Sequence, residues 1–219
     1  MPAGGRSRLE RLLRENNMSN PDRGILTFLR EGLFATRTTG TITPSTPALA
    51  KTIATLADVR SARVVVEFGP GTGAITEVLL SELQPDSTFL AIEINPKFVE
   101  AMRRRFPSLR VIQDTAANVG RHLGELGIDG CDCIVSGLPW ALFDEPLQDH
   151  ILKVVIDVLR PGGRFVTFTY VFSPWTRRGR LFRRKLFDCF DGHVDLSRVV
   201  WTNVPPAFAY CARKPHLSH

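Results

Sequence analysis

Three closely spaced glycines are the first residues whose types and spacing indicate chemistry. Gly69, Gly71 and Gly73, in VVVEFGPGTGAITEVLL, follow an apolar run that predicts a strand and precede a segment with helical periodicity. Glycines allow a tight turn and let a ligand approach the backbone, and the start of a helix leaves amide donors unpaired. The spacing predicts a nucleotide-like ligand. With Ala74 in the last position, it also fits the G-x-G-x-x-G/A pattern of dinucleotide sites.

Two glutamates near these glycines favour a ligand without a pyrophosphate. Glu67 lies two positions before the first glycine, where a carboxylate meets a cation more readily than a phosphate. Glu93, in FLAIEINP, ends the next predicted strand and is placed to accept hydrogen bonds from a ribose diol. S-adenosylmethionine carries a ribose and a cationic amino-acid tail but no phosphate. We therefore expect S-adenosylmethionine as the cofactor.

The segment SGLPW, Ser136 to Trp140, is the second chemical signal and follows another apolar run. A turn at Gly137, Leu138 and Pro139 can present backbone carbonyls that bind an amine and direct its lone pair at a methyl group. Trp140 can face the charge that develops on nitrogen, a cation–π contact of roughly 0.5 to 2 kcal/mol, or it can be a core aromatic. Together with the expected cofactor, this segment is a candidate site for methylating an amine.

No dedicated base for this reaction is evident in the sequence. An alkylammonium has a pKa of about 10 and must lose a proton before attack. His122, His150 and His193 form no recognisable acid–base set and are expected at the surface or at helix ends. Tyr170, after the apolar run RFVTFT, can contact the amine or a lipid phosphate, or it can be a packing aromatic.

A basic segment, RRGRLFRRK over residues 177–185, favours an anionic partner. It places six of the chain's 28 lysines and arginines among nine positions, with aromatic and aliphatic residues between them. Such a segment fits a lipid phosphate or anionic membrane, single-stranded RNA, or a solvated helix face. The lipid interpretation assigns headgroup or membrane binding to five arginines: Arg177, Arg178, Arg180, Arg183 and Arg184.

The order of apolar runs indicates the elements that position these residues. From residue 63 onward, short runs apolar on both faces alternate with amphipathic segments, which predicts a doubly wound α/β fold with a mostly parallel sheet. One such helix is expected over about 146–159, ended by RPGG before the strand RFVTFTY. The segment RVVWTNVPPAFAYCAR predicts an antiparallel C-terminal hairpin around Pro205 and Pro206. We expect a domain over residues 61–219 and an N-terminal helical extension over 1–60, with a basic amphipathic helix at 7–16.

Composition excludes several other classes of protein. The chain has 219 residues, 43% of them hydrophobic, which is enough for one sizeable core, and no apolar stretch reaches the roughly 18 residues of a bilayer span. It has no signal-peptide pattern, and its four cysteines form neither a CxxC pair nor a metal-ligand pattern. We expect a cytoplasmic protein, peripherally associated with the inner membrane face, without a metal.

The combination of EFGPGTG, AIEIN, SGLPW and LRPGG resembles the class I S-adenosylmethionine-dependent methyltransferases over residues 63–213. TTGTITPSTPALAKTIA, SGLPW and VVWTNVPPAFAY are together similar to bacterial phospholipid N-methyltransferases, which convert phosphatidylethanolamine to phosphatidylcholine. A more distant likeness links SGLPW to the N-L-P-Y motif of rRNA adenine dimethyltransferases. There Gly137 replaces the asparagine or aspartate that binds the base, so a nucleic-acid substrate is disfavoured.

The resemblance implies a Rossmann-like sheet of seven strands and a set of cofactor contacts. Glu67 and the three glycines would surround the methionine part of the cofactor, with Ser136 nearby, and Glu93 would bind the ribose. Asn95 and Asp114 would reach the adenine, Asp114 through the amino group. For Asp114, a helix N-cap remains the alternative interpretation.

These observations lead to one principal hypothesis and two alternatives. The first is stepwise N-methylation of phosphatidylethanolamine at an anionic membrane surface, and the second is methylation of a small soluble amine or of RNA. The third is a membrane-binding module that retains the cofactor without turnover. The number of methyl groups and the oligomeric state are not predicted.

Overall fold

The structure is a computed structural model, and it describes residues 45–216. The predicted amphipathic helix at 7–16 lies outside these residues. Across residues 45–216 there is no helix with the length and apolar character that a membrane crossing requires.

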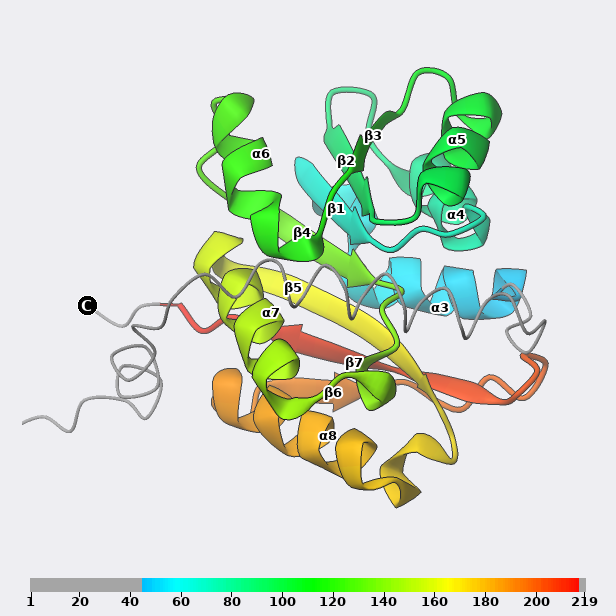
Figure 1. Cartoon of the computed structure of the whole chain (residues 1–219), viewed down its shortest axis with the longest axis vertical. Coiled ribbons are helices and arrows are strands. Elements are labelled where there is room, and N and C mark those ends of the chain that lie inside the picture. The colour runs from blue at the N-terminus through cyan, green and yellow to red at the C-terminus, as the bar shows by residue number, and fades with distance from the viewer. Residues whose placement is uncertain (1–44, 217–219) are drawn as a thin grey trace, which may run out of the picture.

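A seven-stranded sheet forms the centre of the molecule, in the order β3-β2-β1-β4-β5-β7-β6 (Figure 1). Five neighbouring strands run parallel: β1 (Val64–Phe68), β2 (Thr88–Glu93), β3 (Arg110–Gln113), β4 (Cys131–Ser136) and β5 (Leu159–Tyr170). β7 (Ala207–Arg213) runs antiparallel to both β5 and β6 (Val194–Leu196). The predicted Rossmann-like sheet of seven strands, mostly parallel, is confirmed.

Helices cover both faces of the sheet, which explains why the strands are apolar on both sides. One face carries α3 (Pro47–Ala57), α4 (Ala74–Glu82) and α5 (Pro96–Arg105). The other carries α6 (Val119–Glu125), α7 (Glu145–Val158) and α8 (Arg177–Cys189). Single turns of 3₁₀ helix lie between them: η1 (Val59–Ser61), η2 (Ala116–Asn118), η3 (Trp140–Leu142) and η4 (Ser173–Trp175).

The first described helix, α3, packs on the sheet. Thr46 caps its N-terminus by accepting a hydrogen bond from Leu49 N, and Pro47 occupies the first turn. Leu49 and Ile53 are fully buried in the core cluster shared with α4 and with β5 and β7. This part of the predicted N-terminal extension is therefore bound to the sheet by apolar packing.

Two predicted element boundaries were wrong. LRPGG was expected to end a helix before a strand, but β5 begins at Leu159, which pairs with Cys131 of β4. Gly162 N donates to Lys214 O, so these residues already take part in strand pairing. In the C-terminal hairpin, the first strand is β6 rather than residues 198–204, where only Val200 forms a bridge, to Ala207.

The functional residues lie where the parallel strands end. In an open parallel sheet, the loops after the strands meet at the carboxyl edge, which is the usual ligand site. Because β7 is antiparallel, the loop before it joins the same edge, and Val171 N after β5 donates to Pro206 O before β7 at 3.0 Å. The loops 171–176 and 197–206 are therefore neighbours.

Candidate active site

The glycine loop joins β1 to α4 in an unusual backbone conformation. Gly69, Gly71 and Gly73 have φ values of +66°, +58° and +83°, in the left-handed region that side chains disfavour. Gly69 N donates to Ile92 O of β2 at 2.8 Å, and Gly71 N donates to a carboxylate oxygen of Glu93 at 3.1 Å. These bonds fix the loop across the ends of β1 and β2.

Gly73 serves packing as well as conformation. A Cβ atom at this position would lie 2.6 Å from Cε2 of Phe106 and 2.8 Å from Sδ of Met102. The start of α4 therefore contacts α5 closely. Gly73 is not among the residues that line the pocket described below, so its predicted cofactor contact stays a prediction.

Glu67 lies beneath the glycine loop, between β1 and α4. Its side chain is buried and accepts a hydrogen bond from the Thr76 hydroxyl at 2.7 Å. Burial raises the pKa of Glu67 to about 8; the hydrogen bond from Thr76 lowers it, and the nearby Glu93 carboxylate adds to the rise. Thr76, which the sequence analysis did not single out, therefore holds the Glu67 carboxyl group against α4. Glu67 is not among the residues that line the pocket described below, so its predicted cofactor contact stays a prediction.

Glu93 and Asn95 fix the turn after β2. The carboxylate of Glu93 is buried and accepts from Asn95 N at 2.9 Å as well as from Gly71 N. The Asn95 side chain accepts from Lys97 N at 3.0 Å, so it is the N-cap of α5. This cap occupies only the side-chain oxygen, so the predicted contact of Asn95 with adenine stays a prediction.

A pocket opens at the carboxyl edge between the loops after β1, β2, β3 and β4. Two carboxylates line it, those of Glu93 and Asp114. Its other lining residues are small or apolar: Gly69, Ile92, Ile94, Thr115, Ala116, Gly137, Leu138 and Ile151. An apolar slot flanked by carboxylates suits a flat aromatic base joined to a ribose diol.

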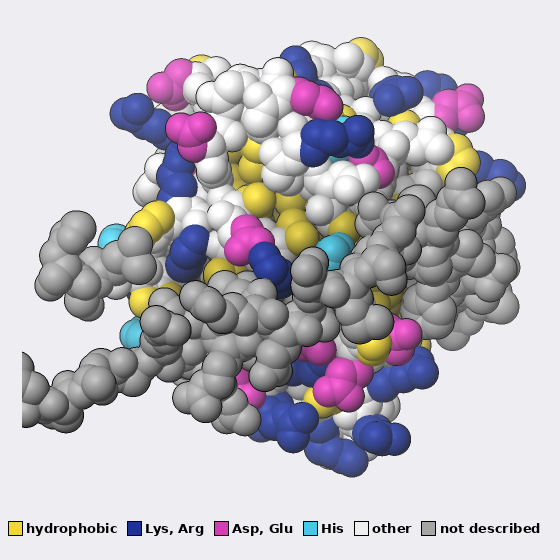
Figure 2. All heavy atoms as spheres, turned by 60° about the vertical axis from the view of Figure 1, so that its left-hand side comes forward, with side chains coloured by type: hydrophobic (Ala, Val, Ile, Leu, Met, Phe, Trp, Pro, Cys, Tyr) yellow, Lys and Arg dark blue, Asp and Glu magenta, His cyan; other side chains and the backbone are white. Residues whose placement is uncertain are grey.

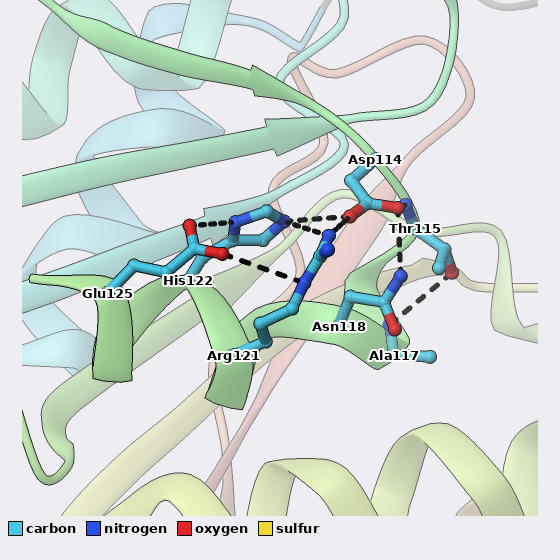
Figure 3. Close-up of polar contacts among 7 residues, drawn as sticks. All are labelled: Asp114, Thr115, Ala117, Asn118, Arg121, His122 and Glu125. Atoms are coloured by element: carbon cyan, nitrogen blue, oxygen red, sulfur yellow. Dashed lines mark hydrogen bonds and ion pairs between the residues drawn. The ribbon is translucent and has the colours of Figure 1, made fainter.

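Asp114, which lines this pocket, is held by four donors (Figure 3). One carboxylate oxygen accepts from Thr115 N at 2.7 Å and from the Asn118 amide at 3.0 Å. The other lies 2.7 Å from both Nη2 of Arg121 and Nε2 of His122. Since a carboxylate is acceptor-only, the imidazole donates here through Nε2.

This cluster bears on two expectations. His122 was expected at the surface or at a helix end; it lies in the last turn of α6 but is buried, with Nδ1 3.3 Å from a Glu125 oxygen. Thr115, not Asp114, caps the following turn, because its hydroxyl accepts from Ala117 N. Burial raises the pKa of Asp114, but hydrogen bonds from His122, Thr115 N and Asn118 outweigh this and place the pKa below its usual value.

The SGLPW corner requires glycine at position 137 because two backbone segments contact each other there. Gly137 N donates to Phe68 O at 2.8 Å, and a Cβ on Gly137 would lie 2.7 Å from Gly69 O. A larger residue would therefore push β4's exit loop away from the glycine loop. The buried Ser136 hydroxyl accepts from Leu138 N at 3.3 Å, so the predicted cofactor residue Ser136 shapes the turn.

The corner carbonyls differ in their partners. Leu138 O accepts from Trp140 N, and Pro139 O accepts from Leu142 N. Within residues 45–216, Gly137 O accepts no hydrogen bond, and it lies 3.9 Å from the position of a Cβ on Gly69, beside the glycine loop. The corner therefore presents one available backbone acceptor next to the pocket.

Trp140 is a core residue rather than a wall of the acceptor site. Its side chain is 3% exposed and stacks on Phe182 of α8, with ring centroids 4.6 Å apart. Its indole N–H donates to the Ser136 hydroxyl at 3.1 Å, and Gln148 donates to its carbonyl at 2.9 Å. The predicted cation–π contact is not supported by this placement, because the ring is enclosed by protein.

Tyr170 is the last residue of β5 and lies at the carboxyl edge of the sheet. It pairs with Ala207 of β7, and its ring stacks on that of Phe172, with centroids 5.6 Å apart. Phe172 is exposed, so the stacked pair extends from the end of β5 to the protein surface. The predicted contact of Tyr170 with the acceptor is compatible with this position and stays a prediction.

The five arginines of α8 do not act as one group. Arg178 donates to Leu142 O and so fastens α8 to the corner, and Arg183 lies over the ring of Phe187. The other three, at positions i, i+3 and i+7, line a second pocket together with Glu145 and Leu181: Arg177, Arg180 and Arg184. Figure 2 shows basic side chains gathered with a few acidic ones at the lower end of the molecule, where α8 lies.

Comparison with known proteins agrees with this fold. A family model described as "Methyltransferase domain" matches residues 65–163. The chain is 35% identical over 176 residues to the ornithine lipid N-methyltransferase of Singulisphaera acidiphila, which covers 78% of this chain and 86% of that protein. It is also 33% identical over 111 residues to ribosomal RNA small subunit methyltransferase A of Burkholderia multivorans. That alignment covers 48% of this chain and 40% of the relative.

Solved structures share the fold at low sequence identity. The O-methyltransferase from Bacillus cereus, in complex with SAH, has a TM-score of 0.64 at 13% identity and covers 95% of this chain and 98% of its own. TomG from Streptomyces achromogenes, an O-methyltransferase in complex with SAM, has a TM-score of 0.62 at 16% identity, covering 95% and 96%. The chain belongs to the S-adenosylmethionine-dependent methyltransferases.

The residues present fit the cofactor of this family. The left-handed glycines bring backbone within reach of a ligand, Glu93 offers a carboxylate at the pocket, and Ile92, Ile94 and Leu138 supply an apolar slot. Residues 45–216 contain no group of three His, Cys, Asp or Glu side chains placed to hold a metal ion.

Proposed function

We propose that this methyltransferase acts on the primary amine of a lipid headgroup, that of phosphatidylethanolamine or of an ornithine lipid. The observation that carries the proposal is the 35% identity to a protein named ornithine lipid N-methyltransferase, over 86% of that protein's length. The likeness of SGLPW and VVWTNVPPAFAY to phospholipid N-methyltransferases supports phosphatidylethanolamine. Both lipids present a primary amine beside an anionic group, phosphate in one and carboxylate in the other.

The proposed chemistry depends on aiming an amine at the cofactor. The bound cofactor supplies an electrophilic methyl group on a sulfonium. Gly137 O, the available acceptor at the corner, binds an N–H of the substrate and so orients the nitrogen lone pair. The dipole of the Gly137 carbonyl also faces the positive charge that develops on nitrogen. The Trp140 indole does not have this role in the proposal, because it is buried.

The amine loses its proton before it reaches the corner. An alkylammonium has a pKa of about 10, and the carboxylates that line the pocket are engaged with donors of this chain. Water is therefore the proton acceptor in this proposal. The rate is expected to rise with pH through the neutral range as the neutral amine becomes more abundant.

Binding to an anionic membrane surface is the second part of the proposal. Four exposed apolar side chains occupy the two neighbouring loops at the carboxyl edge: Phe172, Trp175, Trp201 and Val204. Tryptophan favours the membrane–water interface, and the arginines of α8 add attraction to anionic headgroups. We call these four residues the carboxyl-edge rim. The rim would place the pocket mouth at the headgroup level.

A labelled-methyl assay tests the substrate. Purified protein and radiolabelled S-adenosylmethionine are incubated separately with vesicles containing phosphatidylethanolamine, with vesicles containing ornithine lipid, with total RNA and with an extract of small amines. Label in either lipid, with methylated headgroups identified by mass spectrometry, supports the proposal. Label confined to RNA or to soluble amines contradicts it, and cofactor binding without transfer to any fraction favours a binding module.

RNA adenine is the second candidate because of the identity to ribosomal RNA small subunit methyltransferase A. That likeness spans 48% of this chain and 40% of that protein, a smaller share of each than the likeness to the ornithine lipid N-methyltransferase. Gly137 also lacks the side-chain hydrogen bond that a base amine requires, and a Cβ there would meet Gly69 O. The labelled-methyl assay separates this candidate from the lipid proposal.

A further inference from the structure

Asp114 has no acceptor position left over in this structure. An ionised carboxylate offers about four lone-pair positions. Thr115 N and Asn118 use one oxygen, and Arg121 and His122 use the other, all at 3.0 Å or less. An adenine amino group could hydrogen-bond to Asp114 only if one of these donors left.

The four donors differ in how easily they can leave. Thr115 N belongs to the adjacent backbone, and Asn118 lies in the turn that follows. The His122 side chain is 8% exposed and sits between Asp114 and Glu125. The Arg121 side chain is 60% exposed, so water can solvate its guanidinium once the bond is broken.

Arg121 also has a second position to occupy. Its Nε lies 3.9 Å from a carboxylate oxygen of Glu125, one helical turn further along α6. Figure 3 shows Arg121 on the opposite side of His122 from the body of Glu125, with both acids within its reach. Release from Asp114 therefore leaves the guanidinium in water and beside Glu125.

We infer that Arg121 occupies the acceptor position on Asp114 that the 6-amino group of adenine takes, so that Arg121 competes with the cofactor. His122, Asn118 and Thr115 N hold the carboxylate in place in both states and are positioning groups. The inference rests on the predicted adenine contact of Asp114. It makes Arg121 a residue that weakens cofactor binding.

Calorimetric titration with S-adenosylhomocysteine tests the exchange. This product lacks the sulfonium charge, so removing a nearby cation has little direct effect on its sulfur. Arg121→Ala is expected to lower the Kd by about two- to fivefold, the factor that corresponds to an exposed ion pair. The matched control is Arg104→Ala, which removes another exposed arginine paired with a glutamate on its own helix, and it leaves the Kd unchanged.

A second probe shows whether the amino group is responsible. The analogue of S-adenosylhomocysteine with purine in place of adenine needs no acceptor on Asp114, so Arg121→Ala should not improve its binding. Equal improvement for both ligands would overturn the exchange in favour of general electrostatics. Unchanged or weaker binding of S-adenosylhomocysteine by Arg121→Ala would also overturn it.

The positioning role is tested at His122. His122→Leu removes a donor to Asp114 and is expected to raise the Kd for S-adenosylhomocysteine, whereas His122→Gln keeps an N–H donor and restores part of the affinity. Equal loss in both variants would contradict positioning. Asp114→Ala distinguishes failure of the adenine contact from failure of the exchange. If Asp114→Ala binds S-adenosylhomocysteine as tightly as the wild type, the predicted adenine contact of Asp114 is wrong. If Asp114→Ala binds it more weakly but Arg121→Ala does not bind it more tightly, only the exchange is overturned.

Discussion

At the scale of single residues, Glu67 shows how burial sets the properties of an acid. Its carboxyl group lies between β1 and α4, and its pKa of about 8 means that the folded protein holds it protonated at neutral pH. In the unfolded chain, the same group ionises near its ordinary value of 4.5. Folding stability is therefore full below that value and falls as the pH rises through 8.

Glu67→Gln is expected to remove this pH dependence. The wild type loses at most about 5 kcal/mol of unfolding free energy between pH 4.5 and 8 from this group, whereas the neutral amide loses none. Urea unfolding of both proteins at pH 5, 6.5 and 8, without cofactor, measures the difference. A gap between the two proteins that stays constant with pH would show that Glu67 is ionised in the fold.

Gly137→Ala tests the backbone contact at the SGLPW corner. The new Cβ would lie 2.7 Å from Gly69 O and 3.5 Å from Phe68 O, and neither carbonyl can move without shifting a strand end. We expect a loss of about 1–3 kcal/mol in stability and a large fall in kcat, because the acceptor carbonyl is displaced. Gly124→Ala on α6 is the control, since its Cβ meets nothing within 4 Å. If both variants have the same stability and activity, the corner does not require glycine.

Residue types near the strand ends were predictable, but their partners were not. Gly69, Gly71 and Glu93 follow from local spacing, because the loop and the next strand end are short-range features. Trp140 was ambiguous because only the packing of Phe182, some forty residues later, decides which surface its ring meets. The partners of Asp114 on η2 and α6 were missed because helical periodicity places residues on a face without naming the atoms they bind.

At the scale of elements, α8 has a buried face and an opposite face that carries the three arginines lining the second pocket. Phe182 and Leu186 are buried against the sheet, and Lys185 is buried against α7 through Asp149, at 2.5 Å. The arginines on the opposite side face solvent without an ion pair among the described residues, and like charges three and four apart on a helix repel. An anionic surface would relieve this repulsion.

Replacing Arg177, Arg180 and Arg184 together by glutamine tests that idea. With about 1 kcal/mol per charge near an anionic membrane, binding to vesicles rich in anionic lipid should fall by about two orders of magnitude at low salt. The matched control replaces Arg60, Arg104 and Arg110 by glutamine, which changes the net charge of +6 by the same amount. Equal losses in both triple variants would indicate an effect of net charge alone.

The elements themselves were largely predictable. Strands apolar on both faces and amphipathic segments between them indicated a parallel sheet with helices on both faces. The antiparallel end of the sheet was expected from the C-terminal hairpin. The start of β5 was misplaced because RPGG resembles a turn in isolation. Its pairing with β4 and with the residues after β7 is a long-range feature that local sequence does not reveal.

At the scale of the whole molecule, one edge combines the pocket, the SGLPW corner and the carboxyl-edge rim. The parallel strands bring their exit loops to this edge, and the reversed direction of β7 adds the loop that carries Trp201 and Val204. Asn203, in the same loop, is buried and accepts from Thr46 N. This hydrogen bond holds the loop that carries Trp201 and Val204 against the start of α3.

Trp175→Ser combined with Trp201→Ser should separate membrane binding from catalysis. Loss of two interfacial indoles is expected to lower the rate on lipid in bilayers at least several-fold, since each contributes to partitioning. The rate on the same lipid dispersed in detergent, and the Kd for the cofactor product, should stay within about twofold of the wild type. A parallel loss in detergent would place these tryptophans in the acceptor site instead.

The unequal exposure of the three tryptophans has a practical consequence. Trp175 and Trp201 are 78% and 74% exposed, while Trp140 is enclosed by aromatic rings. Because Trp140 already emits from an apolar environment, any shift of the protein's intrinsic fluorescence toward shorter wavelengths on mixing with liposomes arises from the two outer indoles. The unlabelled protein therefore carries its own optical reporter of contact with lipid.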